Sequence, residues 1–232
     1  MFNKSAQYYD VIYSFKNYDE ESKRISELIK DVNPTALRIL DVACGTAEHA
    51  KRLSMDFDVH GIDIEPEFIK IASSKIPSGV FKIADMRNFD LGIKFDIVLC
   101  LFSSIGYLTK QNEVIAALKC FKSHINEGGA IFIEPWFRPE QWVVNTPHMQ
   151  TVDLPELKIC RMNTSLKEGT ISKIIFHYLI GKSGGVEHFT ESHDLALYSL
   201  DEMASFFDQA ELHIEYDPIG ISGRGLYVAR PR

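Results

Sequence analysis

Three acidic side chains lie in the first half of the chain, each at or near the end of a short apolar run. The runs are "ALRILDVA" with Asp41, "DVHGIDI" with Asp63 and "GVFKIAD" with Asp85. In α/β folds that bind nucleotides, a carboxylate at the end of the second strand accepts hydrogen bonds from the ribose hydroxyls. We therefore predict a nucleoside site in which Asp63 holds the ribose and Asp85 accepts a hydrogen bond from the adenine amino group.

The loop that follows Asp41 indicates which nucleoside derivative binds. The stretch "DVACGTA" has one glycine, Gly45, where a dinucleotide-binding loop has three, and it lacks the Gly-Lys-Ser/Thr end of a phosphate-binding loop. Repulsion between Asp41 and a bound phosphate would be on the order of several kcal/mol. S-adenosylmethionine has no phosphate and carries positive sulfonium and ammonium groups. We predict it as the cofactor, with Asp41 favouring its positive end and the Met86 backbone meeting the adenine ring.

These acids need strands that end at one edge of a sheet. Short apolar runs alternate with helical patterns, which is typical of a parallel sheet covered on both faces. The helical patterns cover 19–32, Ala47–Met55, Pro66–Lys75, Gln111–Ile125 and, near the end, Leu200–Ala210. The predicted fold class is α/β: a Rossmann-like, mostly parallel seven-stranded sheet flanked by helices.

After Glu134, at the end of the fifth predicted strand, the pattern changes. Residues 137–198 read as an antiparallel β excursion of two or three strands, with turns at 167–169 and 183–185. We expect this excursion to cover a substrate or to form a dimer face, so a homodimer is predicted. We assign 1–232 to a single domain, in which 1–33 form an N-terminal helical lid. The closing strands, joined without a helix, predict one antiparallel member of the main sheet.

Composition narrows the class of protein. The chain has 232 residues, 45 % of them apolar, and a formal net charge of −7. An acidic chain has no basic surface for a nucleic-acid backbone, so no nucleic-acid partner is predicted. There is no signal-peptide layout or apolar run of membrane-spanning length, and the four cysteines lack CxxC spacing. We expect a cytoplasmic protein with no membrane partner and no metal, and we interpret His177 and His193 as structural histidines.

Several longer segments carry a resemblance to a known family. "LDVACGT", "GIDI" and "ADMRNF" resemble the cofactor motifs of the class I S-adenosylmethionine-dependent methyltransferases. "AQYYDVIY", "FDIVLCLFSSIG", "GGAIFIEPWFRPE" and "SGRGLYVA" resemble the N,N-dimethyltransferases of dTDP-3-amino-3,6-dideoxy sugars. The likeness covers nearly the whole chain. It implies an enzyme that transfers a methyl group to the amine of a small molecule, a nucleotide-linked amino sugar.

The resemblance also implies which residues touch each ligand. The implied cofactor contacts, completed with Asp41, Gly45 and Ile64 from the same segments, are Tyr18, Asp41, Ala43, Gly45, Asp63, Ile64, Asp85, Met86 and Leu101. The implied substrate contacts, completed with Ser104, are Tyr13, Lys16, Ser104, Glu134, Trp136, Arg161 and Arg224. Three departures lie on the substrate side: Tyr107 stands where the family has histidine, Lys16 stands where arginine is usual, and the segment between Tyr13 and Tyr18 is shorter by about two residues.

Methyl transfer to an amine mainly requires alignment and exclusion of water, because a neutral amine is already a good nucleophile. We predict Tyr13, Tyr107 and Glu134 as the catalytic residues, with the two tyrosines hydrogen bonding around the acceptor. Glu134 would hold a sugar hydroxyl or the amine, the alternative being an ion pair with a nearby cation. Arg224, together with Lys16 and Arg161, would neutralise a diphosphate; the alternative is three separate surface charges. Trp136 would form a flat apolar wall for a sugar or base; the alternative is that it packs in the core.

Two other functions stay open on the sequence. One is a methyltransferase for another small-molecule class, including O-methylation, which Tyr107 in place of histidine keeps open. The other is a protein that binds the cofactor without chemistry. The aromatic segment near the start and the "EPWF" segment argue against a pure binder, because such a protein needs no acceptor pocket.

Overall fold

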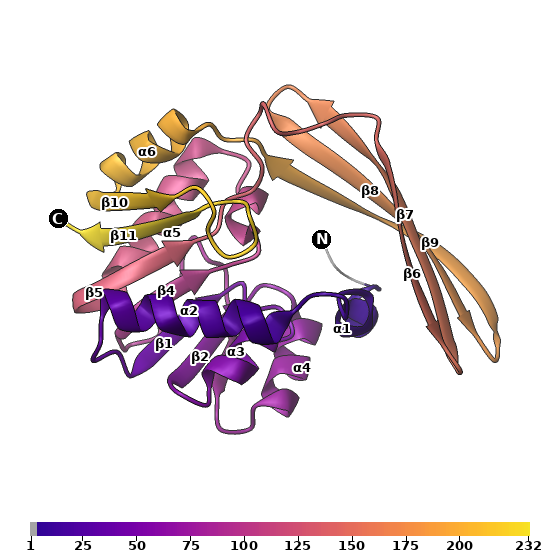
Figure 1. Cartoon of the computed structure of the whole chain (residues 1–232), viewed down its shortest axis with the longest axis horizontal. Coiled ribbons are helices and arrows are strands. Elements are labelled where there is room, and N and C mark those ends of the chain that lie inside the picture. The colour runs from indigo at the N-terminus through magenta and orange to yellow at the C-terminus, as the bar shows by residue number, and fades with distance from the viewer. Residues whose placement is uncertain (1–3) are drawn as a thin grey trace.

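The computed structural model describes residues 4–232 and arranges them as two β-sheets with helices around the larger one (Figure 1). The large sheet contains β1 (Arg38–Val42), β2 (Asp58–Asp63), β3 (Val80–Ile83), β4 (Phe95–Cys100), β5 (Ile125–Ile133), β10 (Leu212–Asp217) and β11 (Leu226–Pro231). The second sheet contains β6 (Pro147–Leu154), β7 (Leu157–Glu168), β8 (Ile171–Lys182) and β9 (Gly185–Ala196). The helices are α1 (Tyr9–Ile12), α2 (Tyr18–Val32), α3 (Glu48–Leu53), α4 (Pro66–Lys75), α5 (Gln111–Ser123) and α6 (Leu200–Gln209), with 3-10 turns η1 (Ala6–Tyr8) and η2 (Ser104–Tyr107).

The large sheet has the strand order β10-β11-β5-β4-β1-β2-β3. The first five strands of the chain run parallel, and β11 runs antiparallel to both β5 and β10. The predicted seven-stranded, mostly parallel sheet is therefore confirmed, as is its antiparallel member. The chain order reverses between β1 and β4, and ligands of open α/β sheets bind at the carboxyl ends of strands at such a point.

The core explains why these strands are almost continuously apolar. Leu40 and Val42 point to one face of the sheet, which α5 and α6 cover, while Ile39 points to the other face. That second face is covered by α2, α3 and α4, and Ile25 and Ile29 of α2 are fully buried there. Because both faces of the central strands β1 and β4 are buried, nearly every position in them favours an apolar side chain.

Local signals set the helix ends, and several predicted ends differ from the structure by one or two residues; α3, for example, ends at Leu53 and not at Met55. The helix expected over Ala47–Met55 begins only at Glu48, because Ala47 has a left-handed backbone with φ +64°. The helix expected to reach Ile125 ends at Ser123, because Ile125 already pairs with Phe95 in β5.

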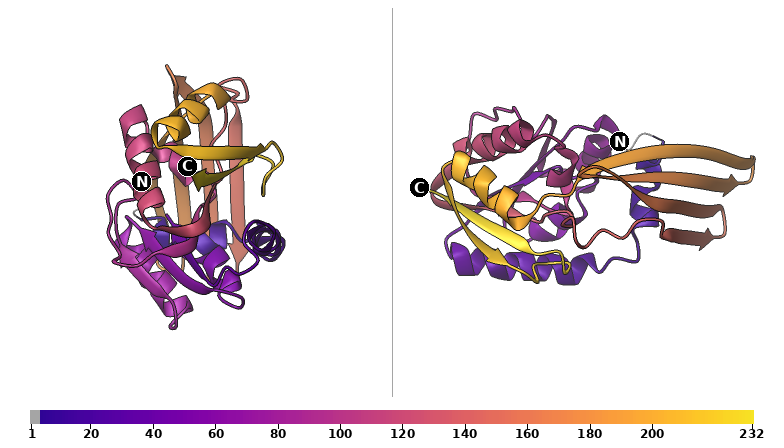
Figure 2. Two further views of the ribbon diagram at one scale, coloured as in Figure 1. Left: turned by 90° about the vertical axis from the view of Figure 1, so that its left-hand side faces the viewer. Right: turned by 90° about the horizontal axis from the view of Figure 1, so that it is seen from above.

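The antiparallel excursion forms a separate four-stranded sheet, in the order β6-β7-β8-β9. The sequence predicted two or three strands and missed β6, whose pairing with β7 extends from Pro147 to Leu154. Figure 2 shows these long strands projecting beyond the main sheet. Their inner face packs against the start of the chain, where Tyr8 and Ile12 join the buried Tyr178 and Phe189 in one cluster.

The predicted lid over residues 1–33 divides into two parts, and Met1–Asn3 lie outside the described residues. Residues 18–32 form α2, which belongs to the core. The preceding stretch, with η1 and α1, lies between the carboxyl edge of the large sheet and the second sheet (Figure 1). None of the helices in residues 4–232 is long and apolar enough to cross a membrane.

Candidate active site

The loop after β1 has an unusual backbone that brings its amides toward the sheet edge. Ala43, Gly45 and Ala47 all have positive φ angles, of 58°, 55° and 64°. Such angles are rare outside glycine and are found where surrounding structure fixes them, often at ligand sites. An added Cβ at Gly45 would meet no atom within 4 Å, so glycine serves the backbone angle there rather than a lack of space.

Asp63, at the end of β2, holds this loop in place. Its carboxylate accepts hydrogen bonds from the Gly45 N–H and the Glu65 N–H, both at 2.9 Å. The side chain is buried, and this burial raises its pKa above the ordinary value. Asp63 lines a cavity of about 180 Å³ at the sheet edge.

This first cavity, which we call the nucleoside cavity, collects most of the predicted cofactor residues. It is lined by Tyr9, Ala43, Gly45, Ile62, Asp63, Ile64, Glu65, Phe68, Ala84, Asp85, Met86, Arg87, Ser104, Tyr107 and Leu108. Asp85 is held by the guanidinium of Arg87, which donates to it at 2.5 Å and lowers its pKa. Arg87 was not predicted, although it stands in the quoted "ADMRNF" segment.

Asp41 lies deeper, in a small adjoining cavity that also includes Tyr18, Leu101 and His49. The Asp41 carboxyl is only 3 % exposed. Burial, and secondly the neighbouring Asp63, raise its pKa to about 7. A positive ligand beside it would offset both effects, whereas a phosphate would add a third negative charge. The two neighbouring carboxyl groups therefore fit a cationic, phosphate-free nucleoside such as S-adenosylmethionine.

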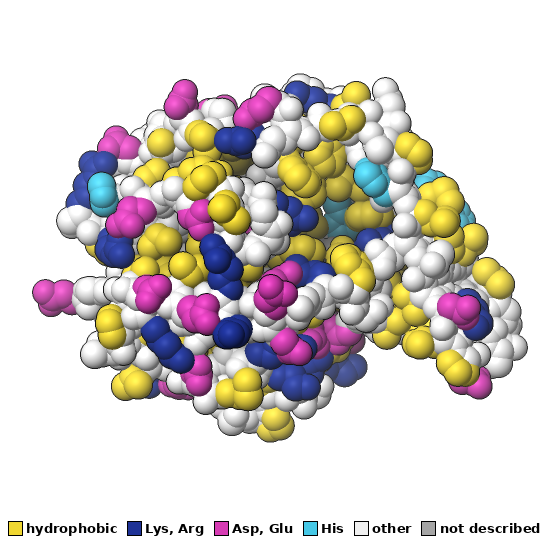
Figure 3. Space-filling view, viewed as in Figure 1, with side chains coloured by type: hydrophobic (Ala, Val, Ile, Leu, Met, Phe, Trp, Pro, Cys, Tyr) yellow, Lys and Arg dark blue, Asp and Glu magenta, His cyan; other side chains and the backbone are white. Residues whose placement is uncertain are grey.

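A larger cavity of about 520 Å³ opens between the large sheet, the start of the chain and the inner face of the second sheet. We call it the acceptor cavity. Figure 3 shows a recess between the body and the four-stranded sheet in which basic and histidine side chains lie among hydrophobic ones. Its residues include the predicted Tyr13, Lys16, Ser104, Tyr107, Trp136, Arg161 and Arg224. Tyr9, Ser104 and Tyr107 line both cavities, so the two spaces meet at these residues.

The three predicted cations come together in the acceptor cavity. Arg224 donates to Ser103 Oγ at 3.1 Å, and its guanidinium lies 5.3 Å from the ring centroid of Trp136. Arg161 lies 4.9 Å from the ring centroid of Tyr13, and its Nη1 is buried without a hydrogen-bond partner among the described residues. A buried guanidinium nitrogen without a partner is costly, so a ligand acceptor there would stabilise it.

Lys16 is the third cation and is almost buried. Its ammonium lies 3.6 Å from the Phe102 ring centroid and 3.2 Å from a Glu21 oxygen. Burial lowers its pKa, while Glu21 opposes that change. Glu21 also contacts His49 Nε2 at 2.7 Å, and His49 lines the small cavity beside Asp41. The Glu21 carboxylate thus links the two ligand spaces, a role that the sequence did not indicate.

Glu134 follows β5 as predicted, but it lies behind the acceptor cavity and is 2 % exposed. It accepts a hydrogen bond from the Phe102 N–H at 2.7 Å and another from Ser222 Oγ. Phe102 and Ser103 have positive φ angles of 50° and 64°. Glu134 therefore holds a strained turn whose Phe102 lines the cavity, and a direct contact with substrate stays a prediction.

At the junction of the two cavities, Tyr107 forms a hydrogen bond with His193, which its strand-like sequence predicted to be a structural histidine. The Tyr107 hydroxyl lies 2.7 Å from His193 Nδ1. His193 lines the acceptor cavity together with Phe176, which also comes from the second sheet. His193 and Arg161 lie on the same face of the second sheet, which follows from the strand register and from no local sequence pattern.

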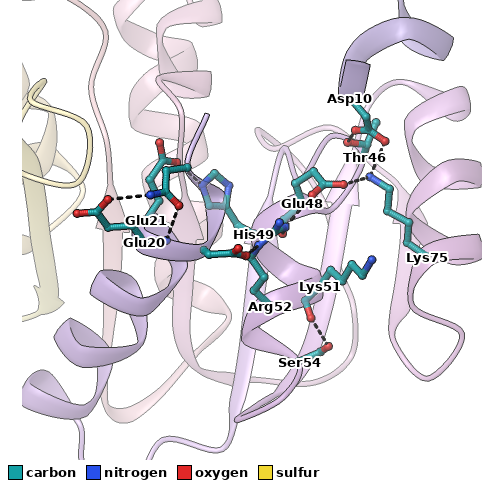
Figure 4. Close-up of polar contacts among 12 residues, drawn as sticks. Asp10, Glu20, Glu21, Thr46, Glu48, His49, Lys51, Arg52, Ser54 and Lys75 are labelled. Atoms are coloured by element: carbon teal, nitrogen blue, oxygen red, sulfur yellow. Dashed lines mark hydrogen bonds and ion pairs between the residues drawn. The ribbon is translucent and has the colours of Figure 1, made fainter. Parts of the chain in front are cut away.

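Polar contacts fasten the start of the chain over the cofactor loop (Figure 4). Asp10 of α1 accepts from Thr46 Oγ1 at 2.5 Å and lies 2.7 Å from the ammonium of Lys75 in α4. Lys75 also contacts Glu48 of α3 at 2.5 Å. The segment that lines both cavities is therefore attached to the elements that form the cofactor loop.

Comparison with known proteins identifies relatives of the whole chain. A family model described as "Methyltransferase domain" matches residues 39–129. Over 230 residues the chain is 36 % identical to the dTDP-3-amino-3,6-dideoxy-alpha-D-glucopyranose N,N-dimethyltransferase of Streptomyces fradiae, covering 97 % of this chain and 90 % of that protein.

Solved structures agree with the sequence relatives. The crystal structure of Streptomyces venezuelae DesVI matches with a TM-score of 0.93 and 33 % identity over 100 % of both chains. The S-adenosylmethionine-bound structure of CalS10, an amino pentose methyltransferase from Micromonospora echinaspora, matches with a TM-score of 0.86 and 28 % identity, covering 99 % of this chain and 97 % of that one. The similarity thus includes both sheets.

Proposed function

The chain belongs to the family of S-adenosylmethionine-dependent methyltransferases that includes the dTDP-amino-sugar N,N-dimethyltransferases, and from this premise we propose that it methylates the amine of a dTDP-linked amino sugar. One observation carries the proposal. A cavity suited to a cationic nucleoside meets, at Ser104 and Tyr107, a larger cavity that contains three cations and several aromatic rings. That pairing suits a positive methyl donor on one side and an anionic, ring-containing acceptor on the other.

The residues of the nucleoside cavity bind and orient the cofactor. Asp63 would hold the ribose hydroxyls, Asp85 and Met86 the adenine, and Asp41 would face the positive end. When bound, S-adenosylmethionine would supply an electrophilic methyl carbon to the amine lone pair, with S-adenosylhomocysteine as the leaving group and the excess proton of the methylated amine passing to solvent water. The aromatic residues Tyr9 and Tyr13 would exclude water, and alignment of this kind can lower a barrier by about 7–11 kcal/mol.

The acceptor cavity accounts for the nucleotide part of the substrate. Lys16, Arg161 and Arg224 contribute positive charge, against the one carboxylate of Glu21 among its described lining residues. Guanidinium groups bind phosphate oxygens in a bidentate manner. Arg161 Nη1 has no hydrogen-bond partner among the described residues, and Arg224 donates to a hydroxyl, Ser103 Oγ. Trp136 would then provide a flat surface beside the ligand; its indole N–H is already used by Ser172 Oγ at 2.8 Å.

A homodimer is part of the proposal. The outer face of the second sheet exposes apolar side chains on neighbouring strands, with Met149, Met162 and Leu179 exposed by 65 %, 46 % and 48 %. An apolar sheet face of this kind favours a partner, and a second copy of the chain is always present. Sedimentation at micromolar concentration tests this: a monomer there would contradict the dimer without affecting the enzymatic proposal.

Methyl transfer can be tested with labelled cofactor and a panel of acceptors. The panel contains dTDP-3-amino-3,6-dideoxy-glucose, the matching dTDP-sugar with hydroxyl in place of the amine, and simple amines without a nucleotide. We expect label on the first compound alone. Label on the hydroxyl sugar would indicate O-methylation, label on simple amines another substrate class, and label on none a binding protein without methyltransferase activity toward these acceptors.

A further inference from the structure

Tyr107 and His193 connect the two parts of the molecule at the point where its cavities meet. Tyr107 ends η2, directly after the turn that follows β4, and His193 lies in β9 of the second sheet. Their contact, 2.7 Å between the Tyr107 hydroxyl and His193 Nδ1, is within the range of a good hydrogen bond. Both residues line the acceptor cavity, and Tyr107 also lines the nucleoside cavity.

The protonation states of the pair follow from burial. His193 is 2 % exposed, and burial lowers its pKa to about 4, so the imidazole is neutral at neutral pH. Burial also raises the pKa of Tyr107, so the phenol keeps its proton. A phenol O–H is a stronger donor than an imidazole N–H, and an imidazole nitrogen is a stronger acceptor than a phenol oxygen. The Tyr107 hydroxyl therefore donates to His193 Nδ1.

We propose that His193 is a positioning residue that makes the Tyr107 oxygen a pure hydrogen-bond acceptor toward the methyl acceptor. With its proton held by His193, Tyr107 presents only lone pairs to the cavity. It can then accept a hydrogen bond from an amine N–H, which leaves the nitrogen lone pair directed elsewhere and available for the new N–C bond. The inference rests on the proposed function, because it assumes an amine at the junction of the cavities.

Without His193 the hydroxyl hydrogen would be free to turn. It would then donate to the amine lone pair, which is the electron pair that must attack. The amine would still bind, but in an unreactive arrangement, so the loss should appear in kcat and not in KM. A merely structural role of His193 would instead lower the stability of the protein or the binding of both ligands.

Two substitutions of similar size separate these roles. His193→Asn keeps an acceptor oxygen close to the place of Nδ1, whereas His193→Leu removes the acceptor. The full-length enzyme is assayed with saturating S-adenosylmethionine and varied dTDP-3-amino-3,6-dideoxy-glucose. We expect His193→Leu to lower kcat by roughly tenfold or more, with KM for the amino sugar within about threefold of wild type. We expect His193→Asn to stay within about threefold of wild type in both parameters.

A double-mutant cycle tests whether the effect acts through Tyr107. In a Tyr107→Phe background, His193→Leu and His193→Asn should have the same kcat, because no hydroxyl is left to orient. Binding of S-adenosylhomocysteine by each variant reports folding. If His193→Leu fails to bind it, His193→Ile, which also lacks an acceptor, takes its place under the same criteria.

The outcomes separate this inference from the function on which it rests. A wild-type enzyme that transfers no methyl group to the amino sugar overturns both. An active wild-type enzyme overturns the inference alone if the apolar and asparagine replacements are equally active, or if their difference persists without the Tyr107 hydroxyl. A selective loss of kcat in the apolar variant, recovered by asparagine, supports it.

Discussion

Asp63 accepts a hydrogen bond from the cofactor loop and is also the residue predicted to bind the ribose. Its two backbone hydrogen bonds leave lone pairs directed to the nucleoside cavity, since each carboxylate oxygen accepts more than one bond. We expect Asp63→Ala to weaken binding of S-adenosylhomocysteine by roughly 1–3 kcal/mol, because the ribose hydroxyls lose their acceptor. Isothermal titration measures this directly. An unaltered dissociation constant would contradict the ribose role.

Asp41 makes the stability of the protein depend on pH. Because its pKa is raised from 3.8 to about 7, the folded protein holds a proton that the unfolded chain releases between these values. Stability without cofactor should therefore fall as pH rises from about 4 to about 7, since a tenfold difference in proton affinity between the folded and unfolded states corresponds to about 1.4 kcal/mol. Asp41→Asn should flatten this fall and raise the melting temperature at pH 8. A variant with the same pH dependence as wild type would contradict a raised pKa of Asp41 in the folded protein.

Arg224 tests the nucleotide side at the same scale. We expect Arg224→Glu to raise KM for the dTDP-sugar by about tenfold or more, because a diphosphate would meet a negative charge in place of a guanidinium. Cofactor binding should not change, since Arg224 does not line the nucleoside cavity. Steady-state kinetics with Arg230→Glu as the control, a more distant arginine on β11, checks the effect. An unchanged KM would remove the argument for a diphosphate subsite.

At the scale of elements, polar contacts attach α1 to the elements around the cofactor loop. Lys75 bridges Asp10 of α1 and Glu48 of α3, and its side chain is only 17 % exposed. Lys75→Met should speed the release of S-adenosylhomocysteine by about three- to tenfold, because partly buried pairs contribute more than exposed ones. Lys23→Met, which removes an exposed pair with Glu27, is the matched control. Equal release rates in the two variants, measured by stopped flow, would contradict the role of these contacts in holding the segment.

The elements also differ in how far the sequence predicts them. The parallel strands, their acids and most helices were predictable because local periodicity and strand ends determine them. The β6 strand was missed because its exposed residues do not alternate clearly. The Tyr107–His193 contact and the burial of Glu134 depend on packing between segments 86 and 32 residues apart, which no local pattern encodes.

In the molecule as a whole, the large sheet lines the nucleoside cavity, and the second sheet contributes only to the acceptor cavity. The end of the large sheet lines its cavity with acidic residues, and the smaller sheet helps to line a cavity with cations and aromatic rings. The net charge of −7 is no obstacle to an anionic substrate, because Lys16, Arg161 and Arg224 lie together in the acceptor cavity. The acceptor residues come from segments far apart in sequence, and for this reason the family resemblance was more informative there than residue spacing.

A crystal structure with S-adenosylhomocysteine and dTDP-3-amino-3,6-dideoxy-glucose bound together would test the proposed division of the two cavities most directly. We expect the ribose on Asp63, the diphosphate among the cations that include Arg161 and Arg224, and the amine beside Tyr107, facing the sulfur. An amine far from the sulfur, or a diphosphate outside the acceptor cavity, would contradict the proposed function of these cavities.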